Sequence, residues 1–401
     1  MADRVAWPAI TFEEHPWSLS EGVLVSRRAR ARARRPYRAA VPPAIAGLEV
    51  ELPADVLAAA EDASLEIARF DEEVGSEIAP FSALLLRTES AASSKIENLT
   101  ASARAIAEAE LGHGGANATL IVANERAMRA ALELADGIDG PGMLAMHAAL
   151  LSVSAAEIAG RWRDQQVWIG GGDHGPHGAV FVPPHHSRVP AAIDDLVRFA
   201  RRTDIPTLAH ASLVHAQFET IHPFVDGNGR VGRALVHAQL RAAGLTRHVT
   251  VPVSAGLLGD VDGYFGALGA YRTGDVVPLV ERFTRAAFAA LANGRTLADD
   301  LRAVREGWQT RITARRDSRT WGVVELLLRQ PVINAAVVHR ELGVGVTNVY
   351  RVLRPLLDSG VIVEFTNKKR DRLWRAPDVL HALDAFAVRA GRRHRSDHGG
   401  S

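Results

Sequence analysis

The sequence of 401 residues contains no cysteine. Disulfides, thiolate nucleophiles and cysteine-based zinc sites are therefore excluded, and the composition suits a reducing cytoplasm. The chain also lacks an apolar run near the ~20 residues that a membrane span needs, and its first residues contain no apolar signal core. The formal net charge of +1 gives no overall field that would attract nucleic acid or a membrane surface. We therefore expect a cytoplasmic protein with no membrane partner.

The residues that are abundant in the chain are those of a helical globular protein. Apolar residues make up 47% of it and charged residues 23%. From Pro53 onward alanine, leucine and glutamate dominate, and apolar positions recur at helical spacing. Residues 52–74, 125–137 and 207–221 are expected to be helices, the second ending at Gly137 as a C-cap. These patterns predict a mainly α fold.

One stretch departs from the helical pattern. Residues 166–171 and 179–184 are short β-prone runs that flank a loop rich in glycine and histidine, which predicts a β-hairpin with one exposed edge. The loop and its flank contain four histidines, His174, His177, His185 and His186. Because the chain has no cysteine and these histidines form no helical HxxxH pair, we interpret them as polar loop residues and not as metal ligands.

The stretch IHPFVDGNGRVGR, residues 221–233, combines a glycine-rich bend with one histidine, one aspartate and two arginines. Successive backbone N–H groups at such a bend can form an anion cradle, which the positive end of the following helix reinforces. Arg230 and Arg233, three residues apart, suit phosphate oxygens. Asp226 suits Mg²⁺, and His222 suits a general base at neutral pH. Together they predict phosphoryl or nucleotidyl transfer from a nucleoside triphosphate.

A plain helix–turn–helix corner is the alternative interpretation of this stretch. It would explain Gly227, Asn228 and Gly229 through their tolerance of positive φ. It would leave His222, Asp226 and the two arginines without a reason.

The stretch resembles the signature of the Fic family, His-Pro-Phe-x-Asp-Gly-Asn-Gly-Arg-x-x-Arg, at every fixed position. The family consists of helical enzymes, most of which transfer AMP from ATP to a protein hydroxyl. The resemblance implies that His222 deprotonates a Ser, Thr or Tyr of a target protein and that Asp226 holds Mg²⁺ on the phosphates. The nucleotide-binding residues that it implies are Glu97, Val167, Trp168, Ile169, Gly170, Asp226, Gly227, Asn228, Gly229, Arg230, Val231, Gly232, Arg233, Tyr264 and Phe265.

The same resemblance assigns finer roles. Asn228 and Gly229 would line the anion hole, and the two arginines would bind the β- and γ-phosphates. Residues 166–184 would form a flap that holds the target as an added strand. Tyr264 and Phe265 would flank the adenine, although Arg272 replaces an asparagine that contacts the base in some members. Glycine at position 229 favours AMP transfer over phosphate transfer, and transfer of UMP or phosphate stays an alternative.

Residues 93–98, SSKIEN, resemble the inhibitory string Ser/Thr-x-x-x-Glu-Gly/Asn of intramolecularly inhibited members, with Ser93, Glu97 and Asn98 at its fixed positions. We expect Glu97 one helical turn after Ser93, on the same helix face. A carboxylate against Arg233 would occupy the guanidinium that the γ-phosphate needs, and ATP would bind in an unproductive pose. The same glutamate could orient water to remove AMP. An ordinary serine-rich helix is the alternative.

Residues 318–380 follow the order helix, helix, glycine turn, helix and two strands, which is typical of a winged helix-turn-helix. Its recognition helix is expected at residues 347–357. The basic side chains on that helix and on the wing are Arg351, Arg354, Lys368, Lys369, Arg370 and Arg372. A winged-helix DNA-binding regulator is therefore an alternative function. Pro355 is expected to interrupt the helix, and a homodimer or another protein contact stays open.

The resemblance extends over about residues 50–290. It predicts a Fic-fold helical bundle with a β-hairpin flap, plus the small C-terminal winged helix. The basic run at residues 27–38 is interpreted as a solvated loop or frayed helix. The expected parts are an N-terminal segment (1–50), a helical region with the inhibitory helix (51–138), the catalytic core (139–290), a helical linker (291–317), the winged helix (318–380) and a disordered tail (381–401).

Overall fold

The computed structural model describes residues 7–19, 26–27, 35–75, 79–133, 138–171, 175–366 and 371–392. Several residues with expected roles lie outside these ranges. They are the C-cap Gly137, the loop residue His174, most of the basic run, and Lys368, Lys369 and Arg370 of the wing.

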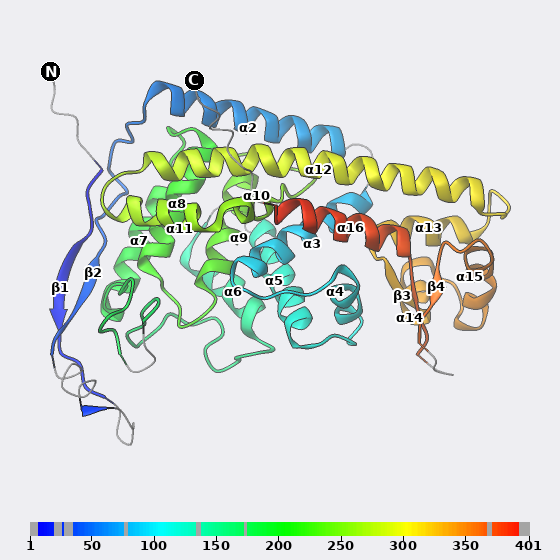
Figure 1. The fold of residues 1–401 in the computed structure, drawn as a ribbon, viewed down its shortest axis with the longest axis horizontal. Coiled ribbons are helices and arrows are strands. Elements are labelled where there is room, and N and C mark those ends of the chain that lie inside the picture. Colours follow the sequence, from blue (N-terminus) through cyan, green and yellow to red (C-terminus); the bar gives the residue numbers. More distant parts are fainter. Residues whose placement is uncertain are drawn as a thin grey trace. The chain divides into compact units, whose positions relative to one another are not determined.

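Helices dominate the described residues, and the prediction of a mainly α fold is confirmed (Figure 1). The α-helices are α2 (Ala54–Gly75), α3 (Ala79–Ile96), α4 (Ala103–Glu110), α5 (Ala116–Glu133), α6 (Gly140–Leu151), α7 (Val189–Ala200), α8 (Thr207–Ile221), α9 (Asn228–Ala242), α10 (Val253–Leu257), α11 (Val261–Arg272), α12 (Val277–Arg311), α13 (Arg319–Arg329), α14 (Ala335–Leu342), α15 (Val349–Asp358) and α16 (Pro377–Ala390). No helix among the described residues combines the length and apolarity that crossing a bilayer requires.

The strands are short. They are β1 (Thr11–His15), β2 (Tyr37–Val41), β3 (Val332–Asn334), β4 (Val363–Glu364) and β5 (Leu373–Arg375). β1 and β2 pair antiparallel, with Thr11 opposite Val41 and His15 opposite Tyr37. This N-terminal hairpin was not expected from the sequence, because the first 50 residues show little periodicity.

The chain divides into two compact units, each built from several segments. The first unit comprises residues 1–62, 127–243 and 262–284, and the second comprises residues 63–126, 244–261 and 285–401. A continuous helix, α12, covers the boundary expected at residue 290.

Helix α8 forms the centre of the first unit, packed between α7 and α9 (Figure 1). Every residue from Leu208 to Ile221 is buried. A helix that is apolar on most sides belongs inside a core, and its polar side chains then need partners. Several bond to main-chain carbonyls, for example Gln217 Nε2 to Pro43 O at 2.9 Å and Thr220 Oγ1 to Ala216 O at 2.8 Å.

In the second unit α3 packs against α10, α13 and α16. Two buried charged groups fix α3 in place. The Glu89 carboxylate accepts hydrogen bonds from the amide and hydroxyl of Ser254, at 2.9 and 2.5 Å. The Arg87 guanidinium forms a two-pronged pair with Glu110 at 2.6 and 2.7 Å. Such geometry restricts the rotation of α3 about its axis.

The elements from α13 to β5 include the expected three helices and two later strands, and a strand that was not expected, β3, lies between α13 and α14; the sheet order is β3-β5-β4. Gly343 ends α14 with φ 63°. Its assignment as a winged-helix domain stays a prediction. Pro355 does not interrupt α15, which continues to Asp358. The disordered tail was expected from residue 381, which is too early. Helix α16 extends to Ala390 and buries apolar side chains at helical spacing, including Val379, Leu383 and Phe386.

Candidate functional site

The candidate site lies where α8 ends and α9 begins, in the first unit. His222 caps α8 with a left-handed backbone, φ 51° and ψ 61°, and its N–H donates to Phe218 O at 2.8 Å. A non-glycine residue in this region is uncommon and stores strain unless the surroundings hold it. The chain therefore turns sharply at His222, away from the helix axis.

Arg163 holds this turn. Its Nε donates to His222 O at 2.8 Å, and its terminal nitrogens donate to the carbonyls of Gln165, Pro184 and Ile221. Its own amide donates to Pro223 O at 2.9 Å. Burial lowers the pKa of the guanidinium to about 10, so it stays charged at neutral pH. The sequence offered no signal for this role, because an arginine 59 residues from the histidine reads as an ordinary surface residue.

The His222 imidazole is mostly enclosed, with 17% of its side-chain surface exposed. Its Nδ1 lies 3.8 Å from Glu219 Oε2. Burial, assisted by the charges of Arg163 and Arg272, lowers the pKa of His222 to about 3. The ring is therefore neutral at physiological pH and can accept a proton. A negative phosphate beside it would raise this pKa, because the imidazolium form would then have a counter-charge.

Phe224 anchors the loop after His222. Its ring is fully buried and stacks on His147 at 3.8 Å between centroids and on Trp162 at 5.0 Å. His147 also positions the next turn, because its Nδ1 accepts from Gly160 N–H and its Nε2 then donates to Asp226 O at 3.0 Å. The sequence reasoning missed His147, which nothing but its position in the fold identifies.

The Asp226 carboxylate projects outward, with 64% of the side chain exposed. Its Oδ1 accepts from Gly227 N–H at 2.6 Å, and its Oδ2 lies 3.4 Å from Arg230. An exposed carboxylate with spare lone pairs fits Mg²⁺, which usually takes one or two protein carboxylates and completes its shell with phosphates and water. Among the described residues, the one cluster of three potential metal ligands is elsewhere, at Asp71, Glu72 and His248.

Helix α9 begins directly beside Asp226. Gly227 is its N-cap with φ 80°, and a Cβ there would lie 2.8 Å from Leu150 Cδ2. The backbone amides of Asn228 and Gly229 occupy the first turn, where no intrahelical carbonyl is available to them. Such amides can bind an anion, and the binding of phosphates at this helix start stays a prediction.

The Asn228 side chain has both ends engaged. Its Oδ1 accepts from Phe224 N–H and its Nδ2 donates to Phe224 O, each at 2.9 Å. The side chain therefore closes the loop, and the main-chain N–H is the part of Asn228 that can serve an anion.

Arg230 and Arg233 are both buried, at 5% and 2% exposure. Gly232, between them, faces α8, because a Cβ there would lie 2.7 Å from Glu219 Oε1 and 3.1 Å from the Phe218 ring. A larger residue would push α9 away from α8 and displace both arginines. Gly232 and the buried Val231 thus serve the packing beneath the cradle.

The two aromatic residues expected around adenine differ in exposure. Tyr264 is 1% exposed, and its hydroxyl bonds to His215 Nε2 at 2.8 Å. Phe265 is 51% exposed. Arg272 is half-buried, with its guanidinium 3.7 Å from the centroid of the Phe181 ring. Of these groups Phe265 offers an open ring face, and stacking of adenine between the two rings stays a prediction.

The flap is less regular than the expected hairpin. Within its described residues the strands meet in a single antiparallel bridge, Ile169 with Phe181. Val180 is 85% exposed and Gly170 has φ 69°. Trp168 contacts Trp17 edge-to-face at 5.5 Å. Val167 and Trp168 are half-buried, so the flap residues predicted to touch nucleotide are only partly open.

The N-terminal hairpin supports the base of the flap. Ala40 N–H donates to Val182 O at 3.0 Å, and the Tyr37 hydroxyl donates to Gln166 Oε1 at 3.0 Å. The strand-like segments TFEEH and YRAAV were the available signal for this hairpin, and they were too short to stand out.

The expected inhibitory string lies in the second unit, at the end of α3. Ser93 is buried inside the helix, but Glu97 follows the last helical residue and is exposed. The expectation that Glu97 lies on the helix face above Ser93 is corrected, because the helix ends at Ile96. Asn98 N–H donates to Lys95 O and Leu99 N–H to Ser94 O, each at 3.0 Å.

These two bonds form a Schellman C-cap, in which the residue after the helix adopts a left-handed backbone. Asn98 has φ 61°. The string requires glycine or asparagine at its last position because these residues tolerate the left-handed backbone that the cap needs.

Comparison with known proteins finds matches to the segment that contains this site. Residues 138–240 match the model of the Fic/DOC family. A probable protein adenylyltransferase of Aquifex aeolicus (strain VF5) is 45% identical over 69 residues, 17% of this chain and 22% of that protein. The protein adenylyltransferase fic-1 of Caenorhabditis elegans is 28% identical over 148 residues, 36% of this chain and 26% of that protein. The chain thus spans about a quarter of the length of these relatives.

The fold agrees with a solved structure. A Fic family protein from Desulfovibrio desulfuricans G20 superposes with a TM-score of 0.51 at 22% identity, covering 82% of this chain and 97% of that chain. The family match covers less than the range of about 50–290 expected from the sequence, but it includes the whole of the loop between α8 and α9. Residues 138–240 of this chain are therefore similar to the Fic/DOC family, and the likeness is limited to this part of the chain.

Proposed function

We propose that the protein is an adenylyltransferase that transfers AMP from ATP to a Ser, Thr or Tyr hydroxyl of a target protein and of itself. The observation that carries the proposal is the neutral, enclosed His222 beside the first turn of α9, with the Asp226 carboxylate projecting next to it. The names of the Aquifex and Caenorhabditis relatives agree with this activity.

The reaction follows from the charges around the loop. The target hydroxyl oxygen attacks the α-phosphorus of ATP, the bond to the bridging oxygen of the β-phosphate breaks, and pyrophosphate leaves. His222 accepts the hydroxyl proton, which the neutral ring can do. The amides at the start of α9, together with Arg230 and Arg233, balance the phosphate charge. Mg²⁺, when bound through Asp226, would neutralise phosphate charge further.

The proposal includes control by Glu97. Glu97 is an exposed carboxylate that directly follows α3, on a turn closed by the carbonyls of Ser94 and Lys95. Competition with the γ-phosphate for Arg233 would slow AMP transfer, and the same carboxylate could direct a water to remove AMP. Target docking along the flap at residues 166–184, a homodimer and a cytoplasmic location belong to the same proposal.

Among the described residues of the C-terminal elements, two of the arginines that could contact DNA are paired with carboxylates; Lys368, Lys369 and Arg370 lie outside those residues. Arg354 bonds to Asp358 at 3.2 Å. Arg372 bonds to Glu364 at 3.2 Å and lies 5.1 Å from the Tyr350 ring. Arginines already paired with carboxylates lose part of their attraction for phosphates. Arg351 is exposed on α15 and could contact DNA. A gel shift would test that contact.

Labelled ATP tests the proposal. The chain of 401 residues should incorporate label from [α-³²P]ATP and none from [γ-³²P]ATP, and EDTA should abolish incorporation. Label from the γ position would show phosphate transfer, and preference for UTP would show UMP transfer. Absence of transfer from every nucleotide, to the chain itself and to a lysate, would contradict an adenylyltransferase.

A further inference from the structure

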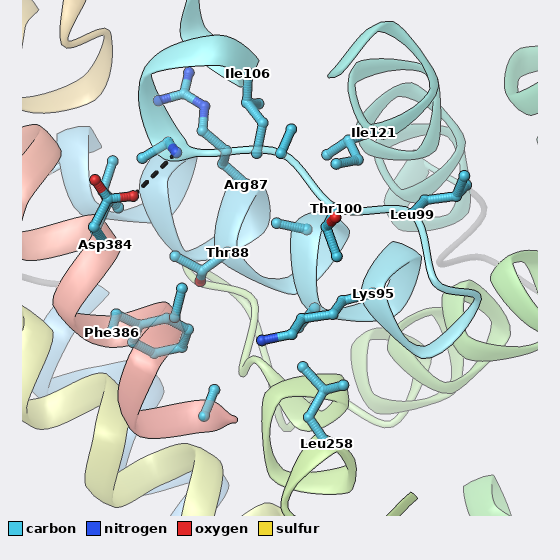
Figure 2. A pocket seen from close by; sticks show the side chains of 17 residues that line it. Arg87, Thr88, Lys95, Leu99, Thr100, Ile106, Ile121, Leu258, Asp384 and Phe386 are labelled. Carbon is cyan, nitrogen blue, oxygen red and sulfur yellow. Dashed lines mark hydrogen bonds between the residues drawn. The ribbon is translucent and has the colours of Figure 1, made fainter. Parts of the chain in front are cut away.

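A cavity of about 150 Å³ lies in the second unit, among α3, α4, α5, α16 and the segment at Leu258 (Figure 2). Its walls are apolar. Ile106, Ile121 and Phe386 contribute buried side chains, and several alanines fill the surface between them. A cavity of this size holds one ring of benzene dimensions.

The wall also includes two cations, and their environments differ. Arg87 is paired with Glu110 at 2.6 and 2.7 Å, and its third nitrogen donates to Arg329 O. Lys95 extends from α3 into the space between Phe386 and Leu258 (Figure 2). Within the part of the chain that the structure describes, the Lys95 ammonium has no hydrogen bond or ion pair with a protein group.

The C-terminal end of α16 lies near Lys95 and partly stabilises its positive charge. A Cβ built on Gly391, the C-cap of α16, would lie 3.0 Å from Lys95 Nζ. The negative end of the helix dipole attracts a cation there, but only weakly at an exposed position. This attraction leaves the three N–H donors of the ammonium without an acceptor among the described residues. An apolar cavity with one such cation is complementary to a small anion that carries an apolar body.

Asp384, the acidic residue at the rim of the cavity, does not pair with the Lys95 ammonium. The Asp384 carboxylate accepts from Ala103 N–H at 3.1 Å (Figure 2), and no ion pair with Lys95 is present among the described residues. Both Lys95 and Asp384 are exposed, so the cavity opens to solvent at this rim and a ligand can enter without unfolding.

We infer that this cavity binds a small aromatic carboxylate, with its carboxylate on Lys95 and its ring between Ile106, Ile121 and Phe386. The site lies directly behind the turn that carries Glu97. Lys95 is part of the string 93–98, its carbonyl caps Asn98, and Leu99 and Thr100 line the cavity.

Occupancy therefore stabilises the present conformation of the end of α3. A ligand shifts an equilibrium only as far as it binds one conformation better than another. Because the ligand contacts the residues on both sides of Glu97, it favours the conformation in which this turn is formed. The proposed effect of the ligand on AMP transfer rests on the proposed control by Glu97. The proposed binding site is independent of that control.

Binding is tested on the full-length chain by isothermal titration with benzoate and with benzamide, its neutral counterpart. Benzoate is expected to bind about tenfold more tightly than benzamide, as a charge-assisted hydrogen bond would give. Lys95→Met should remove this difference, and Ala387→Trp, which places a ring at the exposed mouth, should abolish binding of both. Equal binding of the two probes to the wild type, or none, would overturn the site without needing any variant.

Regulation is tested separately by the rate of self-modification with ATP. Saturating benzoate should slow the wild type by about fivefold, the lower end of ordinary allosteric coupling, and leave Glu97→Gly unaffected. Binding without a change in rate would overturn the coupling and keep the site. If no form of the protein transfers AMP, the proposed function fails, and the titration still decides whether the cavity is a carboxylate site.

Discussion

Helices α8 and α3 are each followed, within two residues, by a non-glycine residue with left-handed backbone, His222 at φ 51° and Asn98 at φ 61°. Their supports differ. The turn at Asn98 is closed by two carbonyls of its own helix, those of Ser94 and Lys95. The turn at His222 depends on Arg163, which belongs to a distant segment and bonds to the carbonyls around it.

The difference teaches how rigidity is distributed. A turn held by its own helix depends on no distant segment, although a ligand that contacts Lys95 and Leu99 would stabilise it further. A turn held by a buried arginine keeps its shape only while the surrounding segments stay in place. We therefore expect substitutions at the two turns to have effects of different size and opposite sign.

The largest effect is expected from removing the imidazole. His222→Ala should keep ATP binding and lower AMP transfer by ~10²–10⁴-fold, the usual contribution of a general base. Incorporation of [α-³²P]AMP measures the rate. His113→Ala, which changes an exposed histidine elsewhere, is the control and should match the wild type. A rate near wild type in His222→Ala would exclude it as the base.

The second-largest effect is expected from removing Arg163, which supports the turn at His222. Arg163→Met should lower AMP transfer by ~10²-fold, since small misplacements of reacting groups have effects of this size. It should also lower the free energy of unfolding by about 2–3 kcal/mol, because buried carbonyls lose their donor. Arg201→Met, at an exposed arginine of the same unit, is the control. Full activity with reduced stability would make Arg163 purely structural.

The turn after α3 should respond in the opposite direction. Glu97→Gly removes the carboxylate and should raise the rate of self-modification by ~5–150-fold, the usual range of coupling between sites. Pulse-chase with labelled and then unlabelled ATP separates faster addition of AMP from slower removal. Glu97→Gln is the matched variant that keeps size and loses charge. No gain in either variant at saturating ATP and Mg²⁺ would refute autoinhibition by this residue.

Acid should destabilise the surroundings of His222. Burial lowers the pKa of His222 and His215 to about 3 and also lowers the pKa of His147 and His210. These groups stay neutral when folded and gain protons near pH 6.5 when unfolded, so stability falls as pH drops from about 6.5 toward 3. One proton corresponds to about 1.4 kcal/mol per pH unit. Urea unfolding at pH 7.5 and 5.5 should show a smaller loss for His222→Gln than for the wild type, and parallel losses would contradict the shift.

The smallest effect is expected at the cap itself. Asn98→Ala should lower the free energy of unfolding by about 1 kcal/mol, because alanine lacks the side chain that eases the left-handed backbone. Asn98→Gly should leave stability nearly unchanged, since glycine adopts this conformation freely. Denaturant titration of both variants is the measurement. Equal stability of alanine and glycine would show that the turn is not confined to positive φ.

Much of the site was predictable because it is contiguous in the chain. The spacing within residues 221–233 brings a histidine, an aspartate, two glycines and two arginines close together along the chain, at the end of one helix and the start of the next. Helix 207–221 was predicted with its observed bounds, and helix 52–74 nearly so, because apolar periodicity and caps act over a few residues. Glu97 was expected on the helix, but α3 ends one residue earlier, at Ile96, since an asparagine C-cap is a weaker stop signal than glycine.

Other features exist only in the folded chain. The clamp by Arg163, the stack of His147 on Phe224 and the burial of Tyr264 join segments about 50–80 residues apart. No local pattern specifies such contacts, because they depend on which surfaces the core brings together. The lowered pKa of His222 belongs to the same class, since it measures the burial and charge that surround the ring. The sequence by itself determined which groups the loop carries, and the tertiary structure decided their orientation and protonation, because packing acts between surfaces whose proximity the order of residues does not reveal.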